Sequence, residues 1–179
     1  MAPRSLHGLF PGGAMLDVPA MSDPTTLPPL AVAVGADHAG VQLKDHLATM
    51  LREEGFAVHD FGTTATEPVD HRDNAHRVAT AVAQGTVQFD VVVCATGIGI
   101  GMSIAANRHL AVRCAVAHDV ISARLGRTHN NANVLALGAG VIGQMVALDC
   151  LHAFVATGFE GGRHAPRRAK LGMVGKVAV

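Results

Sequence analysis

The sequence FDVVVCATGIGIGMSIAAN, residues 89–107, carries the strongest structural signal in the chain. Its apolar run Val91–Val93 predicts a short buried strand that ends at Cys94. Three alternating glycines follow (Gly97, Gly99 and Gly101), and they allow several backbone N–H groups to point at one spot. Ligands of open parallel sheets bind beyond the carboxyl ends of the strands. A thiol and an anion-binding loop at that position indicate chemistry on a small anionic molecule. The ordinary alternative interpretation is a glycine-rich turn beside a packed cysteine.

Apolar runs and helical patterns alternate on both sides of this stretch. Five alternations predict an α/β fold: a single doubly wound five-stranded parallel sheet, a Rossmann-like three-layer sandwich, with a C-terminal helical extension. The other strands are predicted at Leu30–Ala36, Phe56–Phe61, Ala111–Ala117 and Val134–Leu137, and the helices at Val41–Glu54, Asp70–Gln84, Met102–Ala106, Val120–Gly126 and Gln144–Thr157. Residues 127–133, RTHNNAN, are predicted to be a polar loop.

The domain organisation follows from composition along the chain. Residues 1–29 are rich in proline and glycine and have no periodic apolar pattern, so we expect a flexible leader there. One domain is expected over residues 30–172, followed by a short tail at 173–179.

Bulk composition excludes several function classes. The 179 residues carry 14 basic and 14 acidic side chains, so the net charge is zero, which argues against nucleic acid or an anionic membrane as partner. No apolar run approaches the length of a membrane span. Three cysteines without metal-ligand spacing favour a reducing, cytoplasmic setting over a disulfide framework or a zinc site. No metal and no cofactor are expected.

Four polar clusters lie at the ends of predicted strands: Asp37-His38, Cys94 with its glycine loop, His118-Asp119, and His129-Asn130 before the last strand. The first three are expected on one rim of the sheet. Each taken singly has an ordinary explanation as a helix cap or a turn residue. Taken together, a thiol, histidines, a carboxylate and an anion-binding loop are what proton transfer next to a carbonyl requires.

A basic segment near the C-terminus is the remaining signal. Arg163 and Arg167 are spaced to share one helix face, and the guanidinium group matches the geometry of phosphate. A solvated basic surface is the alternative. His164, Arg168 and Lys170 belong to the same segment.

Five motifs, in order along residues 31–172, resemble the type B ribose-5-phosphate isomerase family, which includes the galactose-6-phosphate isomerase subunits. They are GADHAG at 35–40, CATGIG at 94–99, SIAAN at 103–107, THNNANVLALGA at 128–139 and FEGGRHAPR at 159–167. Five motifs in one order are far more specific than any one of them.

The resemblance implies a metal-free aldose–ketose isomerase that acts on a sugar phosphate, here ribose 5-phosphate, through a cis-enediolate. Family members are homodimers or tetramers whose active sites combine residues of two subunits. The implied catalytic roles are Cys94 as the base, Asp37 for hydroxyl protons, and His129 with Asn130 for ring opening. The loop from Thr96 to Ser103, which includes Gly97, Gly99 and Gly101, would bind the enediolate. His38, Arg163 and Arg167 would bind the phosphate.

The sequence departs from the family pattern at three places. Two additional residues precede SIAAN. Aligning the chain with the family on SIAAN places Thr96 at the position of the base, whereas aligning it on the preceding strand places Cys94 there. Cys94 is favoured, because a loop absorbs two residues at little cost. Gly140 stands where the family usually has an arginine, one that commonly helps to bind phosphate, and Arg168 or Lys170 are candidate substitutes. His71 stands in place of the family's tyrosine. These departures concern the substrate more than the reaction.

Two further hypotheses follow. The first is an isomerase of a different sugar, such as a hexose 6-phosphate, a tetrose phosphate or a free sugar. The second is a non-catalytic sugar-phosphate-binding subunit. A dinucleotide-binding protein is a weaker alternative, because GIGIG lacks the GxGxxG spacing.

Overall fold

The computed structural model describes residues 30–38, 40–62, 71–87, 89–94 and 99–172. The expected leader and tail lie outside the described residues, as do Thr96 and Gly97.

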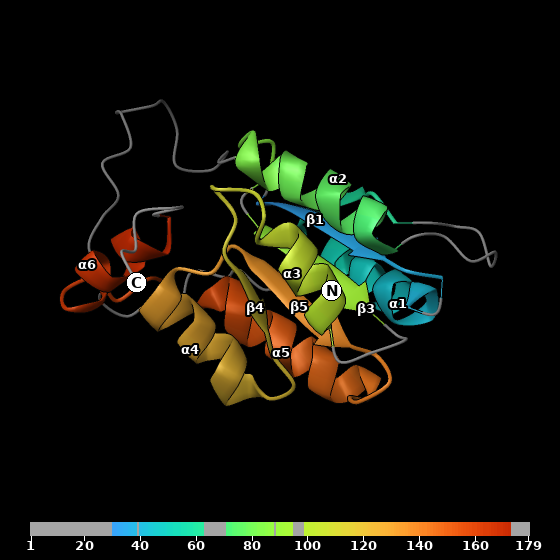
Figure 1. Ribbon diagram of the computed structural model, residues 1–179. Helices are drawn as coiled ribbons and strands as arrows, with labels where there is room; N and C mark the ends of the chain where they lie inside the picture. The colour runs from blue at the N-terminus through green and yellow to red at the C-terminus, as the bar shows by residue number, and fades with distance from the viewer. Residues whose placement is uncertain (1–29, 39, 63–70, 88, 95–98, 173–179) are drawn as a thin grey trace, which may run out of the picture.

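Five parallel strands form one sheet in the order β2-β1-β3-β5-β4. The interior strands β1 and β3 are adjacent although one strand and two helices separate them in the sequence (Figure 1). The sheet and its alternation with helices agree with the sequence-based prediction. The strands are β1 (Ala31–Ala36), β2 (Ala57–Asp60), β3 (Phe89–Cys94), β4 (Cys114–Val116) and β5 (Val134–Gly138).

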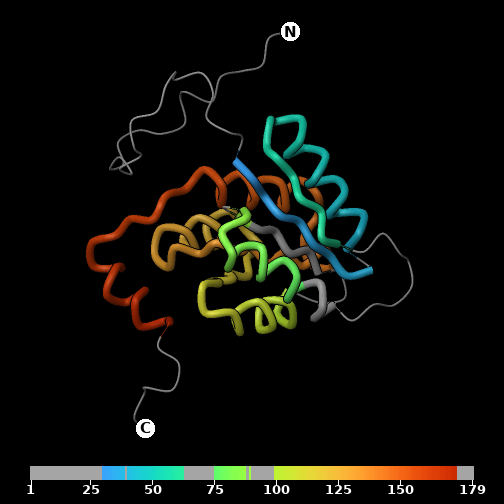
Figure 2. Tube along the Cα trace, turned by 90° about the horizontal axis from the view of Figure 1, so that it is seen from above, coloured from blue at the N-terminus to red at the C-terminus, as the bar shows by residue number. Residues whose placement is uncertain are grey.

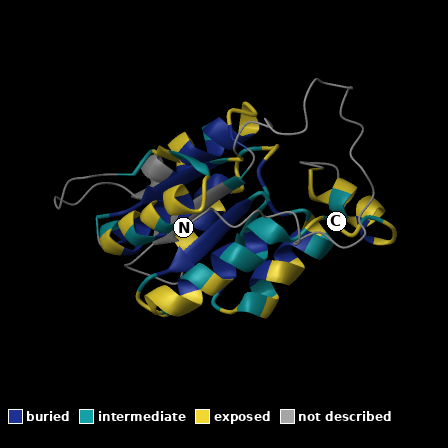
Figure 3. Cartoon of the chain, turned by 180° about the vertical axis from the view of Figure 1, so that it is seen from behind, coloured by how far each residue is buried: buried dark blue, intermediate teal, exposed yellow. Residues whose placement is uncertain are grey.

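Helices cover both faces of the sheet, which gives three layers (Figures 1 and 2). On one face, α1, α4 and α5 pack on Val32, Val34, Leu135 and Leu137, with Phe154 of α5 fully buried. On the other face, α2 and α3 pack on Ala33 and Val134. Figure 3 shows the buried strands between helices whose outer faces are exposed. The helices are α1 (Val41–Glu53), α2 (His71–Ala83), α3 (Ile100–Ala106), α4 (Val120–Asn130), α5 (Gln144–Ala156) and α6 (His164–Leu171).

The prediction of a polar loop over residues 127–133 is wrong for its first half. Helix α4 continues through Asn130, and Asn131 then ends it in the left-handed conformation with φ 49°. The buried Arg127 explains the extension, because its guanidinium donates to the carbonyl oxygens of Ala132 and Thr157 and lies over the ring of Phe89 at 4.7 Å. Burial lowers the pKa of Arg127 to about 10.

The lateral edge of the sheet at β4 is closed by a side chain. The Asn107 amide accepts from the Cys114 backbone N–H at 2.8 Å and donates to the Cys114 carbonyl at 3.0 Å. These are the two hydrogen bonds that a neighbouring strand would supply, so Asn107 protects this edge from pairing with another chain. The asparagine of the SIAAN motif therefore has a structural role.

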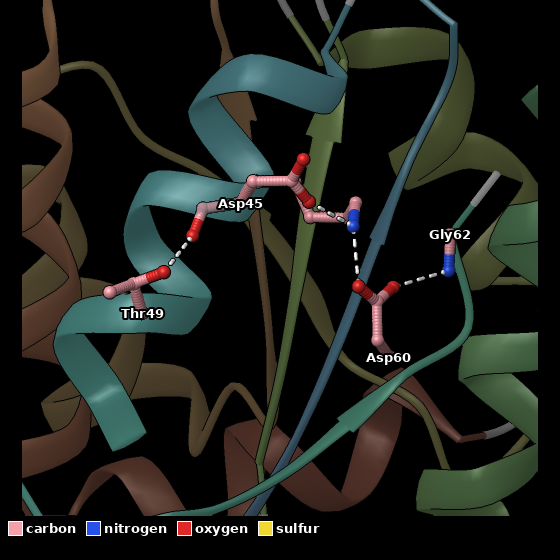
Figure 4. A network of polar contacts seen from close by, with 5 residues as sticks. Asp45, Thr49, Asp60 and Gly62 are labelled. Carbon is pink, nitrogen blue, oxygen red and sulfur yellow. Dashed lines mark hydrogen bonds and ion pairs between the residues drawn. The ribbon is translucent and has the colours of Figure 1, made fainter. Parts of the chain in front are cut away.

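The buried Lys44 of α1 ties that helix to the end of β2. Its ammonium contacts the carboxylates of Asp45 at 2.6 Å and Asp60 at 2.5 Å, and Asp60 accepts from the Gly62 N–H at 2.9 Å (Figure 4). Burial alone lowers the Lys44 pKa, but the two carboxylates outweigh it and leave the pKa raised above 10.5. The charged lysine therefore stabilises the fold fully below pH 10.5, and this contribution is lost only as the pH rises through the raised pKa.

Removal of the Lys44 ammonium should destabilise the protein. We expect Lys44→Ala to lower the free energy of unfolding by about 2–4 kcal/mol, and Lys44→Met, which keeps the packed stem, by about half as much. Urea denaturation at neutral pH measures both. Asp45→Ala is the control, and its exposed carboxylate predicts a loss under about 1 kcal/mol. Equal stability of all four proteins would show that the network does not hold α1 to β2.

Candidate functional site

The strand order reverses direction between β1 and β3, because β2 lies beyond β1 on one side and the remaining strands lie beyond β3 on the other. At such a switch point the connections leave on opposite faces and open a crevice beyond the carboxyl ends of the strands. Ala36 pairs with Val93, so Asp37 and Cys94 are the next residues of two adjacent strands at this carboxyl edge.

Asp37 and His38 are fixed directly after β1. Asp37 is buried, and its carboxylate accepts from the Gly40 N–H at 2.8 Å. The Nδ1 atom of His38 is buried and has no hydrogen-bond partner among the described residues. A buried polar atom without a partner is costly, so a substrate group that paired with His38 would relieve that cost.

The start of α3 lies at the same carboxyl edge. Gly99 precedes the helix in the left-handed conformation, with φ 80°, which strains any residue with a Cβ. Ser103, one turn into α3, is buried and donates its hydroxyl to the Ile100 carbonyl at 3.1 Å. Gly101 lies on the exposed side of the first turn. His71 is the first residue of α2.

Gly140 and Asp119 also lie at the carboxyl edge of the sheet. Gly140 is exposed, two residues beyond the end of β5, and its φ is not in the left-handed region. The backbone conformation there does not require glycine. Asp119, after β4, caps α4 as predicted by accepting from the Ser122 N–H at 2.8 Å.

The remaining predicted residues lie at the opposite, amino edge of the sheet. His129 and Asn130 end α4, three residues before β5 begins. Helix α6 lies beside this end of α4 (Figures 1 and 2), and the Glu160 N–H donates to the Thr128 carbonyl at 3.1 Å. Arg163 and Arg167 are exposed on this segment.

A single chain thus carries two separate groups of site residues. The five residues of β5 separate them by about 16 Å. Arg168 lies at the amino edge, where it and Arg113 line a cavity of about 500 Å³. Burial and the charge of Arg168 lower the pKa of Arg113. Because Gly140 lies at the carboxyl edge, Arg168 cannot replace the missing arginine within its own chain.

The sequence did not predict the contact between the side chains of His129 and His164 at the amino edge. The rings of His129 and His164 stack with centroids 4.2 Å apart and an interplanar angle of 8°, and Glu160 lies 3.5 Å from His164 Nε2. Glu160 and His164 belong to the FEGGRHAPR motif, in which the sequence indicated site roles only for Arg163 and Arg167.

The cysteines differ in their surroundings. Burial raises the pKa of the Cys150 thiol to about 11, so at neutral pH it packs as a small apolar side chain. Cys114 is half-buried in β4. No helix among the described residues combines the length and the apolar character that crossing a bilayer requires.

The chain matches the ribose/galactose isomerase family model over residues 32–171. It belongs to this family. Ribose-5-phosphate isomerase B of Escherichia coli strain K12 is 42% identical over 136 residues, which cover 76% of this chain and 90% of the relative. D-erythrulose-4-phosphate isomerase of Pectobacterium atrosepticum is 39% identical over 80% of this chain and 93% of the relative.

Solved structures agree with this assignment. Ribose-5-phosphate isomerase B of Clostridium thermocellum superposes with a TM-score of 0.77 at 43% identity, covering 80% of this chain and 95% of that one. The Thermotoga maritima protein gives the same TM-score at 39% identity, covering 79% and 97%. The chain is therefore an aldose–ketose isomerase of the sugar phosphate isomerase family.

Proposed function

We propose that the protein interconverts ribose 5-phosphate and ribulose 5-phosphate through a cis-enediolate, with Cys94 as the base. The observation that carries this proposal is the adjacency of Asp37 and Cys94 at the switch point between β1 and β3. The ribose-5-phosphate isomerase B relatives support the choice of substrate.

The chemistry is a proton transfer between two adjacent carbons. The Cys94 thiolate removes the C2 proton of the open-chain aldose, and the electrons move to the C1 oxygen to give the enediolate. Amide N–H groups at the start of α3 stabilise this oxyanion, and Asp37 moves the proton between O1 and O2. Cys94 then returns its proton to C1, which leaves the ketose.

Cys94, rather than Thr96, fits this role on two grounds. A thiol reaches its anionic form at a pH far closer to neutrality than a hydroxyl does. The backbone pairing of Cys94 with Gly138 also makes Cys94 the last residue of the central strand, directly beside the crevice.

Ring opening and phosphate binding require the residues of the amino edge. His129 delivers a proton to the ring oxygen, with Asn130 beside it, and Arg163 and Arg167 bind the phosphate together with His38. Since one chain holds these groups about a strand's length from Cys94, a second copy of the chain completes each site. We therefore propose a homodimer, or a tetramer built from such dimers, with shared active sites.

Isomerisation in deuterated buffer tests the reaction and the base. We expect wild type to convert ribose 5-phosphate with solvent deuterium entering C1 or C2, as followed by proton NMR. Cys94→Ala should lose about 10²–10⁴-fold in rate, the usual contribution of a positioned base, whereas Cys150→Ala serves as a control with little effect. Full activity of Cys94→Ala together with an inactive Thr96→Ala would transfer the role to Thr96.

Mixed oligomers test the shared site. Cys94→Ala and His129→Ala should each be nearly inactive, but the purified hybrid dimer should have about half of wild-type activity, because one of its two sites is intact. Co-expression with two affinity tags and a rate assay of the doubly purified hybrid measures this. Hybrids without activity would place both residues in the site of one chain.

A different phosphorylated sugar is the second candidate substrate. It is favoured by Gly140, which replaces a phosphate-binding arginine, and by the D-erythrulose-4-phosphate isomerase relative. Sugar phosphates that show deuterium exchange while ribose 5-phosphate does not would keep the mechanism and change the substrate. Binding without exchange for every sugar phosphate tried would favour a non-catalytic subunit.

Gly140→Arg should restore the missing phosphate contact. The backbone conformation does not require glycine there, so we expect KM for ribose 5-phosphate to fall about tenfold through a charge-assisted hydrogen bond. Gly140→Ala is the matched control and should leave KM unchanged. An unchanged or higher KM for Gly140→Arg would argue that the phosphate does not bind near the end of β5.

A further inference from the structure

His164 contacts two of the residues to which the proposed function gives roles at the amino edge. Its Nε2 accepts from the Arg163 Nε–H at 3.3 Å, and its ring lies parallel to that of His129 at 4.2 Å between centroids. His164 itself is only 5% exposed. A buried side chain thus lies between a half-buried histidine and an exposed arginine.

The contact with Arg163 favours one protonation state of His164. A ring nitrogen that accepts a hydrogen bond carries no proton, so the ring is neutral with its hydrogen on Nδ1. Burial lowers the His164 pKa, as do the charges of His129, Arg163 and Arg167, while Glu160 opposes them. Glu160 remains 3.5 Å from Nε2, too far for a good hydrogen bond.

The backbone before α6 delivers His164 to this place. Gly161 and Gly162 have φ of 70° and 49°, in the left-handed region that favours glycine. The Glu160 N–H is bonded to the end of α4, and the His164 N–H donates to the Gly161 carbonyl at 2.9 Å. The turn is therefore built so that the first residue of α6 meets the last turn of α4.

We propose that His164 is a positioning residue that couples ring opening to phosphate binding. As a neutral imidazole it holds the His129 ring by stacking and the Arg163 guanidinium by accepting its hydrogen bond. One buried side chain thereby fixes the spacing between the group that protonates the ring oxygen and a group that binds the phosphate. This inference rests on the roles proposed above for His129 and Arg163.

A metal ion is the alternative use of this cluster, because ligand atoms of His129, Glu160 and His164 lie within 4.8 Å of one another. The stacking argues against it. Ring nitrogens bind a metal in the plane of the ring, and two nearly parallel planes about 4 Å apart do not meet at one ion.

Two variants separate the two contacts. His164→Phe keeps a flat ring for stacking but offers no acceptor to Arg163. His164→Gln keeps an acceptor near the position of Nε2 but loses the aromatic ring. The forward rate from ribose 5-phosphate requires ring opening. Deuterium exchange at C1 of ribulose 5-phosphate does not, because the phosphate occupies the oxygen that would close its ring.

For His164→Phe we expect KM to rise about three- to tenfold in both assays, the size of one lost hydrogen bond, with the ratio of forward rate to exchange rate unchanged. For His164→Gln we expect KM near wild type and a forward rate that falls about tenfold relative to exchange. Equal loss in both assays for both variants, or no loss in either, would overturn the proposal.

His129→Ala, assayed in parallel, separates this inference from the proposed function. Selective loss of the forward rate would confirm the ring-opening role of His129. If neither rate falls, the ring-opening role is refuted, but the geometry of His164 is not. Nitrogen-15 NMR then decides for His164 without any substrate, since the proposal requires a neutral ring protonated on Nδ1 at pH 7. A charged His164, or zinc-dependent shifts of both histidines at stoichiometric metal, would overturn it.

Discussion

The pairing of β1 with β3 is the contact on which the molecule depends. Both are interior strands of the sheet, and their neighbours extend outward from this pair in opposite directions. Helix α2 packs closely on this pair, since a Cβ on Gly35 of β1 would lie 2.6 Å from Val78 of α2. It brings Asp37 and Cys94 together from positions 57 residues apart, and no local feature of the chain could do so.

The same sheet also keeps the two groups of site residues apart. Parallel strands send all of their carboxyl ends to one edge, so the residues that follow strands gather there, and the residues that precede strands gather at the other. His129 precedes β5 and Cys94 ends β3. Under the proposed mechanism, both groups can serve one reaction only if two chains combine, so the proposal makes assembly a requirement of the chemistry.

The sequence predicted the strands because buried parallel strands are continuous apolar runs, and it predicted the carboxyl edge because the topology rule is general. It did not predict the end of α4. The letters THNN are typical of a turn, but the buried Arg127, which bonds to the carbonyls of Ala132 and Thr157, favours helix through Asn130. The stack of His129 on His164 depends on where that helix ends and on two left-handed glycines, and neither is visible as a pattern.

The amide of Asn107 occupies the backbone N–H and carbonyl of Cys114, which a further strand beside β4 would otherwise use. Aspartate has the same shape but cannot donate, so deamidation at this one position would set a carboxylate oxygen against the Cys114 carbonyl and expose the strand beside it. The spontaneous ageing of a single side chain would then turn a closed edge into one that can recruit other chains.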